Sequence, residues 1–247
     1  MGELYNENLA WVYDEIYQGF IDYSAEYEFY KNLCNDHNRN RILEIACGTG
    51  NLAKSFTKDF NMYAGLDFSE SMLNIAKEKF PPGNFIQGDM RHLEFVNQFD
   101  TILITGRSTS YLLNNTDLKQ TFKSVHTALE DKGLFIFDCI NADLFMPYIL
   151  KNRNIVHKSN SNKKQFERDS NWVKSKSKKY HLIDWKSTYY QLKDTEKIVL
   201  GKDSTLFRAF TIKEITKALQ HSGFKILEII DRETYAFNTN VYVCKKE

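Results

Sequence analysis

A short glycine-rich segment contains the residue types that most clearly indicate chemistry in this sequence. It begins at Glu44 and continues through Ala46 and Cys47 to Gly48-Thr49-Gly50. Glycine adopts backbone angles that side chains penalise, and it allows the backbone to approach a ligand closely. A helix that starts just after such a turn presents free N–H groups to an anionic ligand. The segment therefore predicts a ligand-binding loop, although a purely structural turn would have the same pattern.

Two acidic residues follow this loop at the ends of later apolar runs. Asp67 ends one run, and its carboxylate can accept two hydrogen bonds from the vicinal hydroxyls of a ribose. Asp89, in Gly88-Asp89-Met90, can accept a hydrogen bond from an adenine amino group. Each has a simpler interpretation, Asp67 as a cap for a helix that begins at Ser69 and Asp89 as an ordinary loop acid. Together, in this order, they predict a nucleoside-containing ligand at one edge of a sheet.

Alternating apolar runs and helical patterns supply the elements that position these residues. Short apolar runs predict strands over 41–46, 62–67, 84–87, 99–105 and 133–139. Helical spacing falls between them, over 51–60, 69–80 and 116–130. A capping box at Thr211–Glu214 predicts a helix over 211–222, with closing strands over 224–230 and 240–245. This alternation predicts an α/β fold whose parallel sheet has helices on both faces.

Residues 155–206 interrupt this pattern with period-two stretches, which predict antiparallel strands. The Asn/Lys/Ser-rich stretch 158–164 is predicted to be a mobile loop. From 151 to 186 the chain has nine lysines and two arginines against three acidic residues. This charge either attracts an anionic acceptor or belongs to a solvated strand face, because Lys174, Lys176 and Lys178 alternate with serines. Five aromatic residues offer apolar surface to a sugar or base ring: Trp172, Tyr180, Trp185, Tyr189 and Tyr190.

The segments described above resemble the class I S-adenosylmethionine-dependent methyltransferases. ILEIACGTGNLA, LDFSESMLNIAKEK, GDM and FDTILITGRSTSYL are similar to the family's first four motifs, and LEDKGLFIFD to its turn before strand five. Ala46 departs from the pattern, because it stands where the family has its first glycine. The resemblance covers residues 40–145 and 206–247. It implies a Rossmann-like, seven-stranded, mostly parallel sheet that ends in a hairpin.

A narrower resemblance, to sugar N,N-dimethyltransferases and glycine N-methyltransferases, rests on YDEIYQGFIDYSAEYEFY and on the antiparallel β insertion after strand five. It implies a single domain over 1–247. Within that domain, 1–34 forms an N-terminal helical lid, and 35–145 with 207–247 forms the cofactor-binding core. Residues 146–206 form the β insertion that binds the acceptor.

The resemblance also assigns roles to residues of the motifs, with S-adenosyl-L-methionine as the cofactor. Glu44 orders the glycine loop, Met72 or Phe68 packs on the adenine face, and Thr105 lies beside the methionine part. The full set of implied cofactor contacts is Glu44, Ala46, Gly48, Gly50, Asp67, Phe68, Met72, Asp89, Met90, Thr105 and Gly106.

Methyl transfer requires little from a protein beyond orientation and exclusion of water. Tyr13 and Tyr17 come from the lid, and a tyrosine face near a sulfonium is a cation–π contact. Tyr111, His126 and Asp138 are candidate bases for a hydroxyl acceptor, with Tyr111 preferred. We expect no metal, because the six histidines are scattered and no cluster has ligand spacing. The expected acceptor is a small molecule, with an amine nitrogen of a nucleotide-linked amino sugar as the candidate.

Two other functions fit parts of the sequence. Gly48-x-Gly50-x-x-Ala53 with Asp67 also matches the loose fingerprint of nicotinamide-dependent oxidoreductases, and a non-catalytic S-adenosylmethionine-binding protein needs no further signature. The net charge of +1 gives no argument for nucleic acid or membrane as a partner. The absence of a signal peptide pattern, of a long apolar run and of paired cysteines predicts a cytoplasmic protein with reduced thiols. Monomer and homodimer both remain open.

Overall fold

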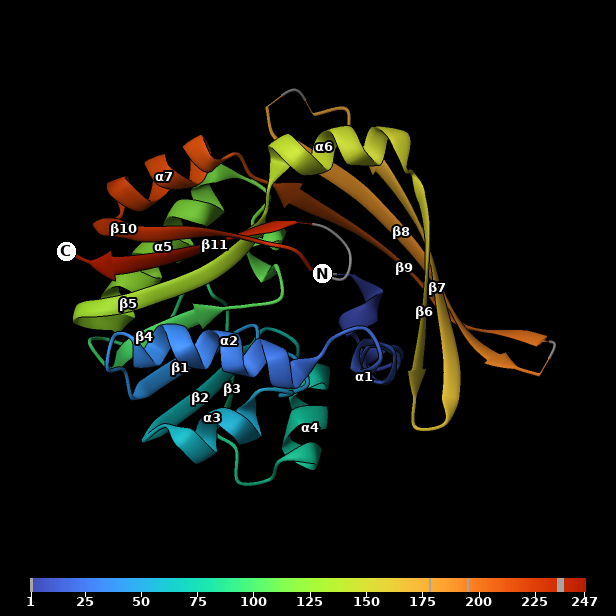
Figure 1. Ribbon diagram of the computed structural model, residues 1–247, viewed down its shortest axis with the longest axis horizontal. Coiled ribbons are helices and arrows are strands. Elements are labelled where there is room, and N and C mark those ends of the chain that lie inside the picture. Colours follow the sequence, from blue (N-terminus) through green and yellow to red (C-terminus); the bar gives the residue numbers. More distant parts are fainter. Residues whose placement is uncertain (1, 178, 195, 235–237) are drawn as a thin grey trace.

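The main sheet of the computed structural model has seven strands in the order β10-β11-β5-β4-β1-β2-β3 (Figure 1). The structure describes residues 2–247 except 178, 195 and 235–237. The strands are β1 (Arg41–Ile45), β2 (Met62–Asp67), β3 (Phe85–Gln87), β4 (Phe99–Ile104), β5 (Leu129–Ile140), β10 (Phe224–Arg232) and β11 (Thr239–Lys246). Pairing is parallel from β5 to β3, whereas β11 runs antiparallel to both β5 and β10. The predicted Rossmann-like sheet is therefore confirmed.

Helices cover both faces of this sheet. The helices are α1 (Ala10–Gln18), α2 (Tyr23–Asn35), α3 (Ala53–Asp59), α4 (Glu70–Lys79), α5 (Asn115–Ala128), α6 (Ala142–Lys151) and α7 (Ile212–His221), with 3-10 turns η1 (Glu3–Tyr5) and η2 (Ser108–Tyr111). Helices α5 and α7 pack on one face, and α2, α3 and α4 pack on the other. The predicted arrangement, a sheet with helices on both faces, is therefore confirmed.

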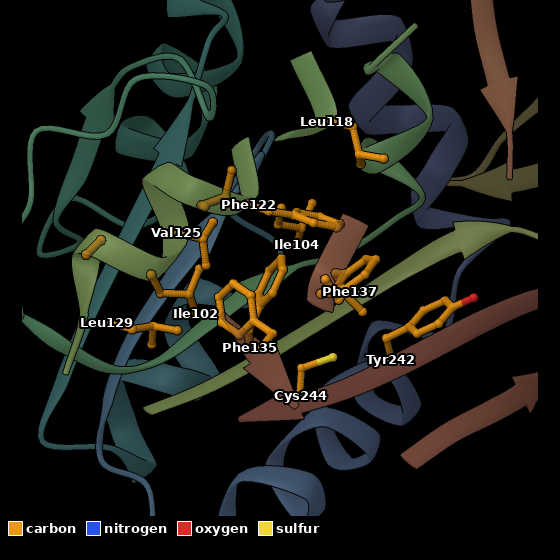
Figure 2. Close-up of a cluster of buried hydrophobic side chains, with 14 of the residues drawn as sticks. Ile102, Ile104, Leu118, Phe122, Val125, Leu129, Phe135, Phe137, Tyr242 and Cys244 are labelled. Carbon is orange, nitrogen blue, oxygen red and sulfur yellow. The ribbon is translucent and has the colours of Figure 1, made fainter. Parts of the chain in front are cut away.

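The alternation of side chains along β5 explains why both faces of the sheet need cover. Phe135 and Phe137 point toward α5, where they pack against Phe122 and other buried side chains (Figure 2). Leu134 and Ile136, the intervening residues, point to the opposite cluster under α2 and α3. Burying one such side chain stabilises the fold by roughly 1.5–3 kcal/mol. The run 134–137 is consequently apolar without interruption, which is the pattern of a central strand covered on both faces.

The insertion forms a second sheet of four antiparallel strands in the order β6-β7-β8-β9. These are β6 (Asn154–Ser161), β7 (Lys164–Lys174), β8 (His181–Lys193) and β9 (Glu196–Ala209). The predicted antiparallel β insertion is present, but the loop expected over 158–164 is wrong. Asn162 and Lys163 alone form the turn, both with positive φ (48° and 62°), as a two-residue hairpin requires.

Helix α6 was not predicted, since the sequence places residues from 146 onward in the β insertion. Asn141 caps this helix by accepting a hydrogen bond from the Asp143 N–H at 2.9 Å. Phe145 and Ile149, four residues apart, bury one face of the helix against Trp172 of β7 and other residues of the insertion. The helical period was hidden by the short length of the segment and by Pro147 within it.

The basic segment is distributed differently from the expected strand face. Lys174 is the last residue of β7, and Lys176 lies beyond the strand, with both side chains exposed. The predicted position of Lys176 on a strand face is therefore wrong, and Lys178 falls outside the described residues. Among the described residues, no helix is long and apolar enough to cross a membrane.

Candidate active site

The first cleft lies at the carboxyl ends of β1, β4 and β5 and has a volume of about 290 Å³. Its floor comes from the glycine loop and from the end of β4, and its sides come from the segment 20–26 and from residues 232–234. Five predicted cofactor residues line it: Glu44, Ala46, Gly48, Thr105 and Gly106. This is the edge of an open α/β sheet at which ligands bind.

Glu44 of β1 contacts a side chain of β2 and one that follows β4, beneath this cleft. Its carboxylate accepts a hydrogen bond from the Tyr63 hydroxyl at 2.6 Å and one from Thr105 Oγ1 at 3.3 Å. The side chain is 2% exposed, and this burial raises the pKa of Glu44 to about 7. Burial disfavours the charged form, and the two donors offset that cost only in part. Both donors lie outside the glycine loop, so the role of Glu44 in ordering that loop stays a prediction.

The glycine loop turns through three left-handed residues. Gly48 and Gly50 have φ of 57° and 69°, and Ala46 has φ of 59°. A Cβ on Gly50 would lie 3.0 Å from Ala76 and Phe85, so this glycine is required for packing and does not line the cleft. A Cβ on Gly48 would meet only Met72 at 3.7 Å, and one on Gly106 would meet nothing within 4 Å. The space beside Gly48 and Gly106 is thus open to a ligand.

Ala46→Gly is expected to stabilise the protein by about 1 kcal/mol, because a left-handed conformation strains an L side chain and not glycine. For a chain of this length, thermal unfolding should shift upward by roughly 2–4 °C. Ala218→Gly, in the buried face of α7, is the matched control and should lose about 1 kcal/mol. A parallel loss in both variants would show that the Ala46 conformation carries no strain.

Asp67 connects the glycine loop to the start of α4. Its carboxylate accepts hydrogen bonds from the Gly48 N–H at 2.9 Å and from the Ser69 N–H at 2.8 Å. The side chain is 8% exposed, and burial raises the pKa of Asp67 above its usual value. Although Asp67 ends a strand, its side chain is buried because the glycine loop folds back over the carboxylate. Ser69 itself caps α4, since its hydroxyl accepts the Met72 N–H at 3.2 Å.

The residues expected around the adenine lie outside the lining of the first cleft. Asp89 accepts two charge-assisted hydrogen bonds from Arg91 Nε and Nη2, and that hydrogen-bonded pair lowers the pKa of Asp89. Phe68 is 54% exposed, whereas Met72 is 2% exposed and belongs to the protein interior. Met90 packs against the core cluster under α5. Of the two candidates for the adenine face, Phe68 is the accessible one, and the Asp89 contact stays a prediction.

A second cleft of about 70 Å³ opens from the first, with which it shares Tyr13, Ile21, Gly106 and Arg107. It brings together the three predicted tyrosines Tyr13, Tyr17 and Tyr111. The rings of Tyr13 and Tyr17 stack with centroids 4.1 Å apart. The second cleft lies between α1, η2 and the insertion.

Sequence reasoning missed Tyr5, a further tyrosine of the second cleft. Its hydroxyl lies 2.5 Å from the Tyr111 hydroxyl, and its backbone carbonyl accepts a hydrogen bond from Ser69 Oγ. Burial raises the pKa of Tyr5 well above its usual value, so its hydroxyl remains protonated. In the sequence, the one indication that Tyr5 belongs to the site is its position among the aromatic residues of the N-terminal segment.

The other two candidate bases are separated by the fold. Asp138 lines the first cleft and accepts a hydrogen bond from the Arg107 N–H at 2.7 Å, and burial raises its pKa to about 6. His126 lies near the end of α5 against Phe224, and it lines neither cleft. Of the predicted insertion aromatics, Trp172 and Trp185 line the second cleft, whereas Tyr189 is buried in the cluster beneath α1.

Helix α1 is tied to the glycine loop by polar contacts. Asp14 accepts a hydrogen bond from the Thr49 hydroxyl at 2.5 Å and pairs with Lys79 of α4 at 2.7 Å. Gln18 donates a hydrogen bond to Asn51 at 2.6 Å. Helix α1 also packs against β7 and β8 through Phe166 and Tyr189. It therefore joins the loop of the main sheet to the insertion.

Comparison with known proteins identifies the class that this fold and site define. A family model described as a methyltransferase domain matches residues 42–133. A ubiquinone/menaquinone biosynthesis C-methyltransferase of Campylobacter jejuni is 30% identical over 187 residues, which is 66% of this chain and 76% of that protein. A putative methyltransferase of Geobacillus is 27% identical over 230 residues, or 90% of each chain.

Two further comparisons extend the likeness. A dTDP-3-amino-3,4,6-trideoxy-alpha-D-glucopyranose N,N-dimethyltransferase of Streptomyces venezuelae is 33% identical over 138 residues, which is 55% of this chain and 58% of that enzyme. The solved structure of an S-adenosylmethionine-dependent methyltransferase from Clostridium acetobutylicum has the same fold. Its TM-score is 0.75 at 24% identity, over 96% of this chain and 97% of that one.

The chain belongs to the class I S-adenosylmethionine-dependent methyltransferases. It is an enzyme, and S-adenosylmethionine is its cofactor, as predicted; the nicotinamide-dependent and non-catalytic alternatives are not supported. The residues present fit this cofactor, because the loop from Ala46 to Gly48 and the side-chain-free Gly106 leave an open cradle above the buried Glu44.

Proposed function

We propose that this enzyme methylates an amine nitrogen of a small-molecule acceptor, with a nucleotide-linked amino sugar as the first candidate. One observation carries the proposal: the first cleft, on the glycine loop, opens into a second cleft between α1 and the insertion. The amino-sugar dimethyltransferase of Streptomyces venezuelae supports a nitrogen acceptor. We also propose that the protein acts in the cytoplasm, because its four cysteines are buried free thiols.

The proposed roles follow from where each side chain lies. The bound cofactor supplies a methyl group activated by its sulfonium charge. Glu44, Ala46 and Gly48 hold the cofactor from the loop, and Thr105 and Gly106 border it at the end of β4. Tyr13 lines both clefts, so its ring can lie against the cationic centre. The other proposed cofactor contacts are Gly50, Asp67, Phe68, Met72, Asp89 and Met90.

The acceptor side requires orientation more than acid–base chemistry. An amine must arrive deprotonated, and hydroxyl oxygens that accept hydrogen bonds from its remaining N–H groups direct its lone pair toward the methyl group. Tyr5 and Tyr111 supply such hydroxyls in the second cleft, and Tyr17 lies beside them. Tyr13, Tyr17 and Tyr111 are therefore proposed as the residues that contact the reacting groups. Closure by α1 excludes water from the same space.

A methyl-transfer assay tests this function. The protein is incubated with S-adenosylmethionine and either a dTDP-linked amino sugar, the same sugar with a hydroxyl in place of the amine, or a quinol. Mass spectrometry then follows S-adenosylhomocysteine and the methylated product. We expect methylation of the amine alone. Methylation of the hydroxyl sugar, or of a ring carbon in the quinol without any amine product, would contradict the proposal.

Asp14→Ala is expected to accelerate cofactor release about fivefold, since the lost contacts to Thr49 and Lys79 amount to about 1 kcal/mol in a partly exposed site. Stopped-flow dissociation of S-adenosylhomocysteine measures this rate. Glu7→Ala, an exposed acid that precedes the same helix, is the matched control and should leave the rate unchanged. Equal rates for Asp14→Ala and the parent would show that α1 does not limit cofactor release.

A further inference from the structure

The second cleft has an unusual charge composition for a space lined mainly by aromatic side chains. Arg107 and Arg168 both line it, and its described lining contains no aspartate or glutamate. The first cleft differs, because Glu26, Glu44 and Asp138 are among its lining residues. The adjoining clefts therefore present different electrostatic environments, and the positive one is the proposed acceptor site.

Arg168 is fixed deep in this cleft by neutral groups. It lies in the middle of β7 with 1% of its surface exposed. Its Nη1 donates to the Tyr17 hydroxyl at 2.7 Å, and its Nη2 lies 3.2 Å from His157 Nδ1. Arginine can only donate, so Nδ1 of His157 accepts and the ring is neutral. These two contacts set the direction of the guanidinium.

The positive charges of Arg168 and Arg107 also affect a neighbouring histidine. Burial, together with the nearby charges of Arg168 and Arg107, lowers the pKa of His157 to about 4. The guanidinium of Arg168 also lies 5.2 Å from the ring centroid of Trp185 and 5.1 Å from that of Phe20. Such a weakly hydrated planar cation, held between aromatic rings, binds carboxylate and phosphate oxygens well.

We propose that the second cleft is an anion subsite in which Arg168, assisted by Arg107, binds a carboxylate or phosphate group of the acceptor. The inference rests on the proposed function, and it narrows the acceptor class to amines that carry an anionic group. The exposed Lys174 and Lys176 line neither cleft, so their attraction to an anion is screened by solvent.

Anion titration tests the subsite without requiring methyl transfer. Trp172 and Trp185 line the cleft, so tryptophan fluorescence of the protein saturated with S-adenosylhomocysteine is recorded while inorganic phosphate or acetate is added. We expect a saturable change, with at least tenfold weaker binding in Arg168→Gln. Lys174→Ala/Lys176→Ala is the matched control and should bind like the parent at 0.15 M salt. No saturable change in the parent, or equal affinity in Arg168→Gln, would overturn the proposal.

Two more variants distinguish the effect of the Arg168 charge on anion binding from its effect on folding. Tyr17→Phe removes a hydrogen bond to Arg168 but leaves the cation in place, so anion affinity should change less than threefold. Arg168→Lys keeps a positive charge and loses the planar fork, so its affinity should be intermediate; it replaces Arg168→Gln if that variant does not fold. Loss of anion binding in Tyr17→Phe equal to that in Arg168→Gln would show that Arg168 only anchors α1.

Matched acceptors connect the subsite to catalysis. Methylation of 2-aminoethyl phosphate is compared with that of ethanolamine, and methylation of β-alanine with that of propylamine. In the parent, kcat/KM for the anionic member should be at least ten times higher in one pair, and the ratio should fall toward one in Arg168→Gln. An equal loss on both members would mean a structural role and contradict the proposal. If no amine is methylated, the proposed function fails, while the anion titration still decides the subsite.

Discussion

Asp67→Ala should weaken S-adenosylmethionine binding by roughly 1–3 kcal/mol and also destabilise the cofactor-free protein by about 2 kcal/mol or more. The second effect follows from burial: the substitution leaves the Gly48 and Ser69 N–H groups without their acceptor. The glycine loop then loses its connection to α4. Calorimetric titration with the cofactor and chemical denaturation without it measure the two quantities separately.

Asp67→Asn and Ser69→Ala are the control variants for this experiment. The asparagine keeps one oxygen acceptor, so it should retain part of the stability while losing affinity for the ribose hydroxyls. Ser69→Ala removes the cap of α4 and should cost about 1 kcal/mol of stability with little change in affinity. If Asp67→Ala loses stability but binds the cofactor like the parent, Asp67 only supports the loop and does not contact the ribose.

Glu44→Gln should change the pH dependence of stability by about 3 kcal/mol. Burial raises the pKa of Glu44 from 4.5 to about 7 in the folded protein. A raised pKa stabilises the folded state fully below the unfolded value, and this stability is lost as pH rises from about 4.5 through 7. Glutamine does not titrate, so its stability relative to the parent should rise by this amount between pH 4.5 and pH 8. Urea unfolding at several pH values measures the difference.

Asp138→Asn provides a second variant with the same sign and a different range. Burial raises the pKa of Asp138 to about 6, so its relative gain in stability should be complete at a lower pH than that of Glu44→Gln. A difference between Glu44→Gln and the parent that stays constant from pH 4.5 to pH 8 would mean that Glu44 keeps an ordinary pKa when buried.

The sequence alone was sufficient for the features that depend on local pattern. Runs such as 99–104 are short and mostly apolar, which is typical of central parallel strands, and Ser69 and Thr211 mark helix starts through their own side chains. The loop from Glu44 to Gly50 is likewise local, because its backbone angles and the free N–H groups behind it are set by neighbouring residues. The class of fold followed from these features, and the cofactor followed from the resemblance of the same segments to a known family.

Only the tertiary structure decided which side chains meet across long sequence separations. Tyr5 of η1 meets Tyr111 of η2, and Arg168 meets Tyr17 because α1 packs against the insertion; no local pattern encodes either contact. The burial of Asp67 likewise depends on the fold of the loop above it. Hydrophobic periodicity and helix capping reflect the preferences of a single segment. The burial and the charge of the second cleft arise where α1, η2 and the insertion meet. For that reason the lysines expected to attract an anion lie exposed, and a buried arginine occupies the cleft instead.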